Sequence, residues 1–222
     1  MAAAFLNMIL ADRSKTSYHD FFDDFDNYTA GDWTITETGT GTRAVQNERN
    51  GVLKITNAAA DDDANFLQWS GNTNASTVET FKYEAGKFLY FGMRFKISDA
   101  THSDFVFGLQ ITDTTPLAVT DGIYFRKDDG DAYLDFVVVK DSTATTSTAI
   151  ATLAADTYTV VEAYYDGSTS KIQLYVNGVS AGSSVLTNVP DDEELTLSFG
   201  VQNGEAAAKA LSVDWVRVVQ GR

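Results

Sequence analysis

The sequence predicts an all-β protein in which two antiparallel sheets pack face to face as a sandwich. The first observation is the period-two alternation of apolar and polar residues, clearest in residues 87–98 and 158–178. The second is the Gly, Asn and Asp residues that separate these segments at short spacing, as turns do. The third is the aromatic content of 12%, mostly Phe and Tyr, which favour pleated and half-buried positions.

Residues 158–178 predict two strands joined by a tight turn. Asp166-Gly167 marks that turn, because Gly adopts positive φ without a steric cost. Asn177-Gly178 marks a second turn, so we expect a third strand through Val185 and Leu186 to fold straight back. The side chains expected on the buried face are Thr159, Val161, Ala163 and Tyr165, followed by Ile172, Leu174 and Val176.

The N-terminal segment differs from the rest. We expect residues 2–11 to form a short amphipathic helix or an extended arm, followed by a polar connector over residues 12–17. Two interpretations stay open: the arm docks on its own domain, or it anchors the chain to a neighbouring subunit. The chain therefore divides into an N-terminal arm or anchor over residues 1–17 and a sandwich domain over residues 18–222.

The other elements follow in chain order. Residues 18–33 predict short strands with a bend, and residues 71–86 and 141–148 are polar and predict loops. In residues 87–98 the alternating face of large apolar residues is expected to be buried. The further predicted strands are residues 51–57, 65–70, 87–98, 104–112, 122–127, 131–140, 149–153, 194–202 and 211–219. About fourteen strands without an internal repeat indicate one domain.

Composition excludes several classes of protein. The net charge of −15 argues against a nucleic-acid binder, because phosphate backbones repel an acidic surface. The chain has no cysteine, so no disulfide framework holds the fold. No apolar run approaches the length of a membrane-spanning helix. The opening MAAAFLNMIL lacks a basic start, and Asp12 and Arg13 follow it, so we do not expect a signal peptide.

Five segments carry a family resemblance when they are taken in order: FDDFDNYTAGDW, GVLKITN, KFLYFGMRFKIS, TVVEAYYDGSTSKIQLYVNG and LSVDWVRV. Over residues 18–219 they resemble the concanavalin A-like, laminin-G-like jelly-roll superfamily. The most specific pieces are Tyr175-Val176-Asn177-Gly178 and Val213-Asp214-Trp215-Val216. The resemblance implies a jelly-roll sandwich of two antiparallel sheets.

Many members of that superfamily are glycoside hydrolases, which need two carboxylates flanking the scissile bond. The retaining members place them on one strand as Glu-x-Asp-x-Glu or Glu-x-Asp-x-x-Glu, and this chain has no such run. Glu162 and Asp166 straddle a turn, while Asp131 and Asp135 share a strand without a Glu beside them. We therefore predict that the protein is not an enzyme and that it has no catalytic residues.

The sequence gives little support for other catalytic or metal sites. His19 and His102 are expected to be solvated loop residues, and no Ser has a nucleophile-elbow context. The acidic runs 61–63 and 128–131 are candidates for calcium, but neither has a recognisable ligand spacing, so solvated turns are favoured. We predict no metal and no cofactor. Three tryptophans could stack on sugar rings, although core packing is the expected role of Trp215; they are Trp33, Trp69 and Trp215.

Four further segments carry a second resemblance: LADRSKTSYHDFFDDFDNY, FLQW, DFVFGLQITDTTPLAVTDGIYF and PDDEELTLSFGVQNGEAAAKALSVD. They resemble proteins of tailed bacteriophages encoded among capsid genes. This resemblance implies a virion structural protein, namely a capsid decoration (cement) protein on the capsid exterior. Jelly rolls occur in both capsid and lectin domains, so the fold does not decide between these roles.

The sequence therefore leads to two functional hypotheses. The first is a decoration protein that binds the major capsid protein, as a homo-oligomer and expected to be a trimer, and stabilises the shell. Its expected anchor is Phe5, Leu6, Met8, Ile9 and Leu10. The alternative is a carbohydrate-binding, lectin-like module, on the virion for host adhesion, at the tail, or elsewhere. Host glycans are possible partners in either case, and nucleic acids and membranes are not expected.

Overall fold

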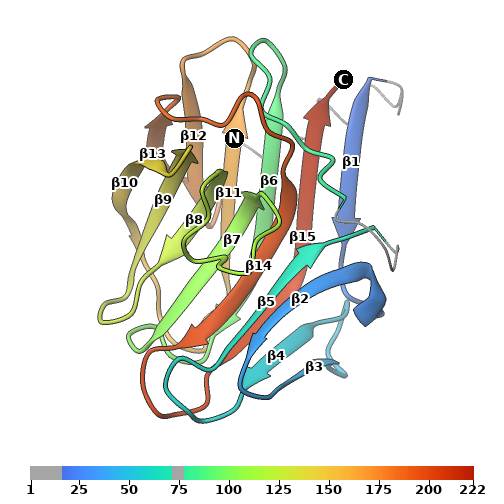
Figure 1. The fold of residues 1–222 in the computed structure, drawn as a ribbon, viewed down its shortest axis with the longest axis vertical. Coiled ribbons are helices and arrows are strands. Elements are labelled where there is room, and N and C mark those ends of the chain that lie inside the picture. Colours follow the sequence, from blue (N-terminus) through green and yellow to red (C-terminus); the bar gives the residue numbers. More distant parts are fainter. Residues whose placement is uncertain (1–16, 72–77) are drawn as a thin grey trace.

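The computed structural model describes residues 17–71 and 78–222 as two antiparallel sheets packed face to face (Figure 1). Sheet A contains, in spatial order, β13 (Val179–Val185), β12 (Lys171–Val176), β11 (Thr159–Tyr165), β6 (Leu89–Ile97), β15 (Ala210–Gly221), β4 (Leu53–Asn57) and β3 (Gly41–Val45). The strand β1 (Tyr18–Asp23) also pairs with β15, beyond the part of β15 that pairs with β4.

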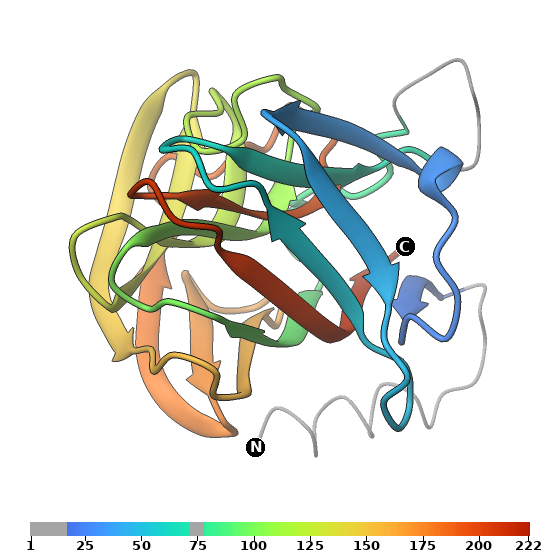
Figure 2. The ribbon, with the colours of Figure 1, turned by 90° about the horizontal axis from the view of Figure 1, so that it is seen from below.

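Sheet B contains, in spatial order, β10 (Thr143–Thr152), β9 (Tyr133–Lys140), β8 (Gly122–Lys127), β7 (Ser103–Gln110), β14 (Thr196–Asn203), β5 (Ala64–Trp69) and β2 (Trp33–Thr38). A short 3₁₀ turn, η1 (Ala30–Asp32), precedes β2. Both sheets twist and lie as two layers, which Figure 2 shows from below. The predicted all-β sandwich is confirmed.

The strongest predicted strands have the predicted faces. In β6 the apolar alternate residues from Leu89 to Ile97 are buried in the core, while Arg94 and Lys96 face out and are only partly buried. The predicted central hairpin is β11 and β12, and its third strand is β13. Alternation therefore predicted both the strands and the sides that they bury, as expected for sheets with one dry face.

Aromatic rings from both sheets fill the space between the two layers. Phe95 of sheet A stacks on Phe105 of sheet B with ring centroids 4.3 Å apart. Phe91 of sheet A contacts Phe107 and Phe125 of sheet B edge-on, at 5.8 and 6.0 Å. Offset and edge-on ring pairs add to the stabilisation from burial, so this layer ties the two sheets together.

Several elements differ from the sequence prediction. The polar residues 141–148 were predicted as a loop, but Thr143 begins β10, which extends to Thr152 with a register shift between Ser147 and Ala151. The strand β3 was not predicted, and neither was β2 beyond Trp33. Trp215 was expected in the core, but the pairing of β15 with β6 shifts between Val213 and Trp215. The bulge lets Val213 and Val216 both face inward, so Trp215 lies on the outer face and is only partly buried.

No helix among the described residues is long and apolar enough to cross a membrane. The predicted N-terminal arm and its anchor residues lie outside the described residues.

Candidate functional site

The outer face of sheet B is partly covered by the segment between β7 and β8, residues 111–121, which we call the β7–β8 loop. A small apolar cluster lies beneath it and is separate from the main core. Its members are Ala64, Phe66, Val106, Val119, Tyr124, Val137 and Val139, with Ile111 and Leu117 packed against them. Burial of these side chains holds the loop against the sheet.

Hydrogen bonds from two glutamines set the position of this loop. Gln110 Nε2 donates to the Pro116 carbonyl at 2.8 Å, and Gln68 Nε2 donates to the Ile111 carbonyl at 3.0 Å. Gln68 Oε1 in turn accepts the Asp113 N–H at 2.9 Å. The Asp113 carboxylate then accepts the Thr115 N–H at 2.6 Å, closing a local turn. The loop is therefore anchored at several points along its length.

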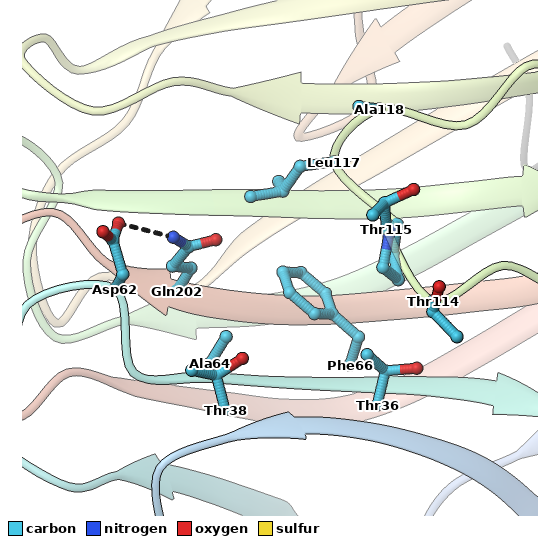
Figure 3. A pocket seen from close by; sticks show the side chains of 11 residues that line it. Thr36, Thr38, Asp62, Ala64, Phe66, Thr114, Thr115, Leu117, Ala118 and Gln202 are labelled. Atoms are coloured by element: carbon cyan, nitrogen blue, oxygen red, sulfur yellow. Dashed lines mark hydrogen bonds between the residues drawn. The ribbon is translucent and has the colours of Figure 1, made fainter.

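A pocket of about 470 Å³ opens between this loop and the strands β2, β5 and β14 (Figure 3). Small-molecule sites typically enclose about 300–1,000 Å³. The residues that line the pocket are Thr36 and Thr38 of β2, Ala64 and Phe66 of β5, Gln202 of β14, Asp62, and Thr114, Thr115, Pro116, Leu117 and Ala118 of the loop. Threonines thus stand on both sides, with Phe66 between them (Figure 3).

Asp62 closes one end of the pocket. It has a positive φ of 62°, and its Oδ1 accepts a hydrogen bond of 2.7 Å from Gln202 Nε2. A buried amide network holds the turn that carries it, since Asn203 Nδ2 donates to the carbonyls of Ala58 and Ala60 at 2.8 Å each. Asn57 Nδ2 donates to the Asp63 carbonyl at 2.9 Å. The carboxylate is thus held in place from the sandwich interior.

Phe66 forms the floor of the pocket, and a glycine makes room for it. Gly200 of β14 pairs with Phe66 of β5. A Cβ at position 200 would lie 2.4 Å from the Asn65 carbonyl oxygen and 2.4 Å from Phe66 Cδ1. The Phe66 ring therefore lies over Gly200, where any larger residue would displace the ring.

The arrangement suits hydrogen bonding to a polyhydroxylated ligand better than acid–base chemistry. Threonine hydroxyls both donate and accept, and an ionised Asp62 only accepts. Asp62 is the only carboxylate among the described residues that line the pocket. Two other carboxylates on the outer face of sheet B accept hydrogen bonds from backbone N–H groups. Asp104 accepts the N–H of Asp129 at 2.8 Å, and Asp135 accepts the N–H of Ala149 at 2.7 Å. Burial raises the pKa of Asp104, and the Asp129 N–H opposes that shift.

The acidic runs considered for calcium are held by protein groups. Asp63 is buried, and its Oδ2 accepts the Ala60 N–H at 3.0 Å, so this residue is not part of a solvated turn. In the second run, Asp131 Oδ1 accepts the Tyr133 N–H at 2.7 Å. Across residues 17–71 and 78–222, no three His, Asp or Glu side chains lie together as metal ligands would.

The other residues singled out from the sequence lie apart from the pocket. Trp33 and Trp69 contact each other edge-on at 5.3 Å, and Trp33 is buried in the core. His19 was expected in a solvated loop, but it lies in β1 against Phe81, at 4.9 Å between ring centroids. Burial lowers the pKa of His19. His102 is exposed in a loop, as predicted.

Sequence reasoning singled out Asp62, within the acidic run 61–63, but missed the other residues of the pocket. Thr36, Thr38, Phe66 and Gln202 come from strands that are distant in the sequence and meet only in the folded sheet. The available signals were weak, namely the Thr-rich segment TITET and the Thr-Thr-Pro of the β7–β8 loop.

Solved structures of low sequence identity share this fold. A protein of unknown function from Shewanella oneidensis MR-1 superposes with a TM-score of 0.63 at 17% identity, covering 92% of this chain and 87% of that one. An endo-1,3-beta-glucanase from Streptomyces sioyaensis has a TM-score of 0.62 at 12% identity, covering 92% and 97%. The carbohydrate recognition domain of Emp47p has a TM-score of 0.60 at 10% identity, covering 92% and 97%.

No curated protein sequence matches this chain. Residues 93–221 match the family described as the Concanavalin A-like lectin/glucanases superfamily, and this segment is more than half of the chain. The strands of the matched segment run from within β6 to the end of β15, and they include most of both sheets. The chain belongs to the concanavalin A-like lectin/glucanase superfamily.

Proposed function

We propose that this protein is a carbohydrate-binding, lectin-like module that binds its ligand in the pocket on the outer face of sheet B. The observation that carries the proposal is the lining, in which threonine hydroxyls, Asp62 and Gln202 surround the ring of Phe66. A sugar presents hydroxyl groups at its rim and C–H groups on its faces. Directional polar groups around an apolar floor match both features.

The charges favour a neutral sugar. Asp62 is the only ionisable group among the described residues of the pocket, and the whole chain has a net charge of −15. A ligand with carboxylate or sulfate groups would approach against this field, and Asp62 would repel it at short range. Neutral oligosaccharides should therefore bind in preference to sialylated, uronic or sulfated ones.

A glycan array with the labelled chain tests the proposal. The pocket variant is Thr36→Val with Thr38→Val, which removes two hydroxyls while keeping the size of each side chain. A lost hydrogen bond costs about 1 kcal/mol, roughly fivefold in Kd for each hydroxyl that contacts the sugar. The matched control is Thr34→Val, because Thr34 lies on the same strand, two residues away, and does not line the pocket.

The proposal expects binding to neutral glycans that weakens in the pocket variant and persists in the control. No binding to any glycan, or equal binding by all three proteins, would contradict it. Sugar release from the bound glycans would show an enzyme and overturn the prediction that the protein has no catalytic activity.

A role as a capsid decoration protein is the second proposal, and it is compatible with sugar binding. The observation that favours it is the sequence resemblance to phage proteins encoded among capsid genes. Its test is the variant Phe5→Asp with Ile9→Asp, which should abolish shell binding and leave a folded chain. Imaging of native particles would then show bare shells, whereas normal occupancy would refute the anchor.

A further inference from the structure

One side of the sandwich is formed by the edge strands of both sheets, β10 of sheet B and β13 of sheet A. Both lie at the left in Figure 1, and the two strands contact each other. Asn188, after β13, donates a hydrogen bond of 3.0 Å to the Thr145 hydroxyl of β10. We call the surface formed by residues 142–155 and 172–190 the uncharged side.

The uncharged side contains no Asp, Glu, Lys, Arg or His. Charged residues make up 21% of the chain, so about seven would be expected in segments of this combined length. The edges at the opposite side of the sandwich, β2 and β3, do carry charges, including Glu37 and Arg43, which form an ion pair of 3.0 Å. Isolated edge strands are usually protected by charged side chains.

The same side exposes apolar side chains. Val179 and Val185 of β13 are 69% and 44% exposed, and next to this side Tyr133 of β9, which pairs with Thr152 of β10, is 50% exposed. Only two other large apolar side chains are exposed among the described residues, Phe22 and Val45. Charged residues border the surface, including Lys140, whose Nζ lies 2.9 Å from the Asp192 carboxylate. A surface that is depleted of charge and bordered by charged residues is typical of protein interfaces.

We propose that the uncharged side is the contact surface between two copies of this chain, related by a two-fold axis. Two chains that each have a charge of −15 repel one another over their acidic faces, so an uncharged surface is where they approach at least cost. A strand of ten residues is about 34 Å long, and two sheets with their side chains span about 20 Å. The area is then on the order of 700 Å² per copy, close to that of a standard interface.

The contact is made by side chains and not by a continuous sheet. The pairing of β10 with β9 shifts between Ser147 and Ala151, and that of β13 with β12 shifts at Leu174 and Tyr175, opposite Gly182. Bulges of this kind interrupt the regular row of N–H and C=O groups that a further strand would need.

Sedimentation velocity of the full chain over a hundredfold range of concentration tests the inference. The expected species has twice the chain mass of 24.2 kDa. Salt distinguishes the mechanism, because screening weakens repulsion between the acidic bodies and should strengthen this dimer, whereas ion-paired contacts would weaken.

The diagnostic variant is Val179→Glu with Val185→Glu, which places four like charges at the interface and should raise the dimer Kd by about a hundredfold or more. The matched control is Val45→Glu, because Val45 is 37% exposed on β3, the opposite edge of the same sheet. Circular dichroism checks that each variant is folded. A monomeric or trimeric wild-type chain, or equal dissociation in both variants, would overturn the inference.

Discussion

Lys209 Nζ lies 2.7 Å from Asp99 Oδ2, and the side chain of Lys209 is only 5% exposed. The same ammonium lies 2.6 Å from Glu205 Oε1. Asp99 also accepts the N–H groups of Thr101 and His102 at 2.8 and 2.9 Å. One buried cation therefore ties the loop after β6 to the loop before β15.

The variant Asp99→Asn should destabilise the protein. It removes one partner of a buried cation, which costs about 3–5 kcal/mol when no other partner remains. Glu205 still pairs with Lys209, so we expect a loss below that range, about 2 kcal/mol. Urea denaturation at neutral pH measures it. Glu194→Gln, which breaks the exposed pair with Lys82, is the control and should change the stability by less than about 1 kcal/mol.

The stability lost in Asp99→Asn should depend on pH. Burial raises the pKa of the Asp99 carboxyl, but the hydrogen bonds from Lys209 and the two N–H groups outweigh it, so the pKa lies well below its usual range. The stabilisation is therefore complete above the unfolded pKa of about 4 and is lost as the pH falls below it. The difference in stability between wild type and Asp99→Asn should shrink below about pH 4. A constant difference would contradict this account of the ion pair.

The variant Gly200→Ala should affect both stability and the pocket. Its Cβ would lie 2.4 Å from the Asn65 carbonyl oxygen, so the backbone or Phe66 must move. Overpacking of this kind costs about 1–3 kcal/mol. Gly31→Ala is the control, because no atom lies within 4 Å of the added Cβ. Gly200→Ala, but not Gly31→Ala, should lower the midpoint of thermal unfolding and weaken glycan binding. Unchanged binding in Gly200→Ala would show that Phe66 is not part of the site.

The variant Phe105→Ala should test the aromatic layer between the sheets. Phe105 is fully buried and stacks on Phe95, and replacing such a ring by alanine costs about 3–5 kcal/mol. Val45→Ala, at an exposed position, should cost less than about 0.5 kcal/mol. Denaturant titration measures both. A loss below about 1 kcal/mol in Phe105→Ala would mean that the sheets are not held together at this point.

Tyrosines whose pKa is raised by folding should limit stability at high pH. Burial, with Glu48 beside it, raises the pKa of Tyr158 to about 12, and burial with Glu162 raises that of Tyr90 further. Groups whose pKa is raised on folding stabilise the protein fully below the unfolded pKa, about 10, and less as the pH rises above it. Phenolate absorbance should therefore appear together with loss of circular dichroism. Complete ionisation in a folded protein would contradict this prediction.

Much of the fold could be predicted from the sequence, because many central strands place apolar residues on the face that packs in the core and more polar residues on the opposite face. The strand β6 and the hairpin of β11 and β12 show this alternation, and their buried faces were predicted correctly. The first part of β10, residues 143–148, could not be recognised, because at the edge of its sheet most of the residues of this strand are exposed and no apolar alternation arises. The face occupied by Trp215 could not be predicted either, since a bulge in β15 reverses the alternation.

The candidate site was less predictable than the fold. Its lining combines β2, β5, β14 and the β7–β8 loop, and no local pattern in the sequence joins them. Buried charges were also hidden: Lys127 is the last residue of a predicted strand, yet it is fully buried and donates to the carbonyls of Thr101 and Ser103. The burial of such a charged side chain depends on loops that close over it, and the identity of the residue does not indicate this.

The most direct measurement for the proposed function is an NMR titration of the isotopically labelled chain with neutral glucose, mannose and galactose oligosaccharides. Saturable shifts in the amide signals of Asp62, Phe66, Thr115 and Gln202 are the predicted result, because these residues surround the pocket. Shifts confined to the outer face of sheet A, or no shift with any of these sugars, would contradict the assignment of the pocket as a carbohydrate site.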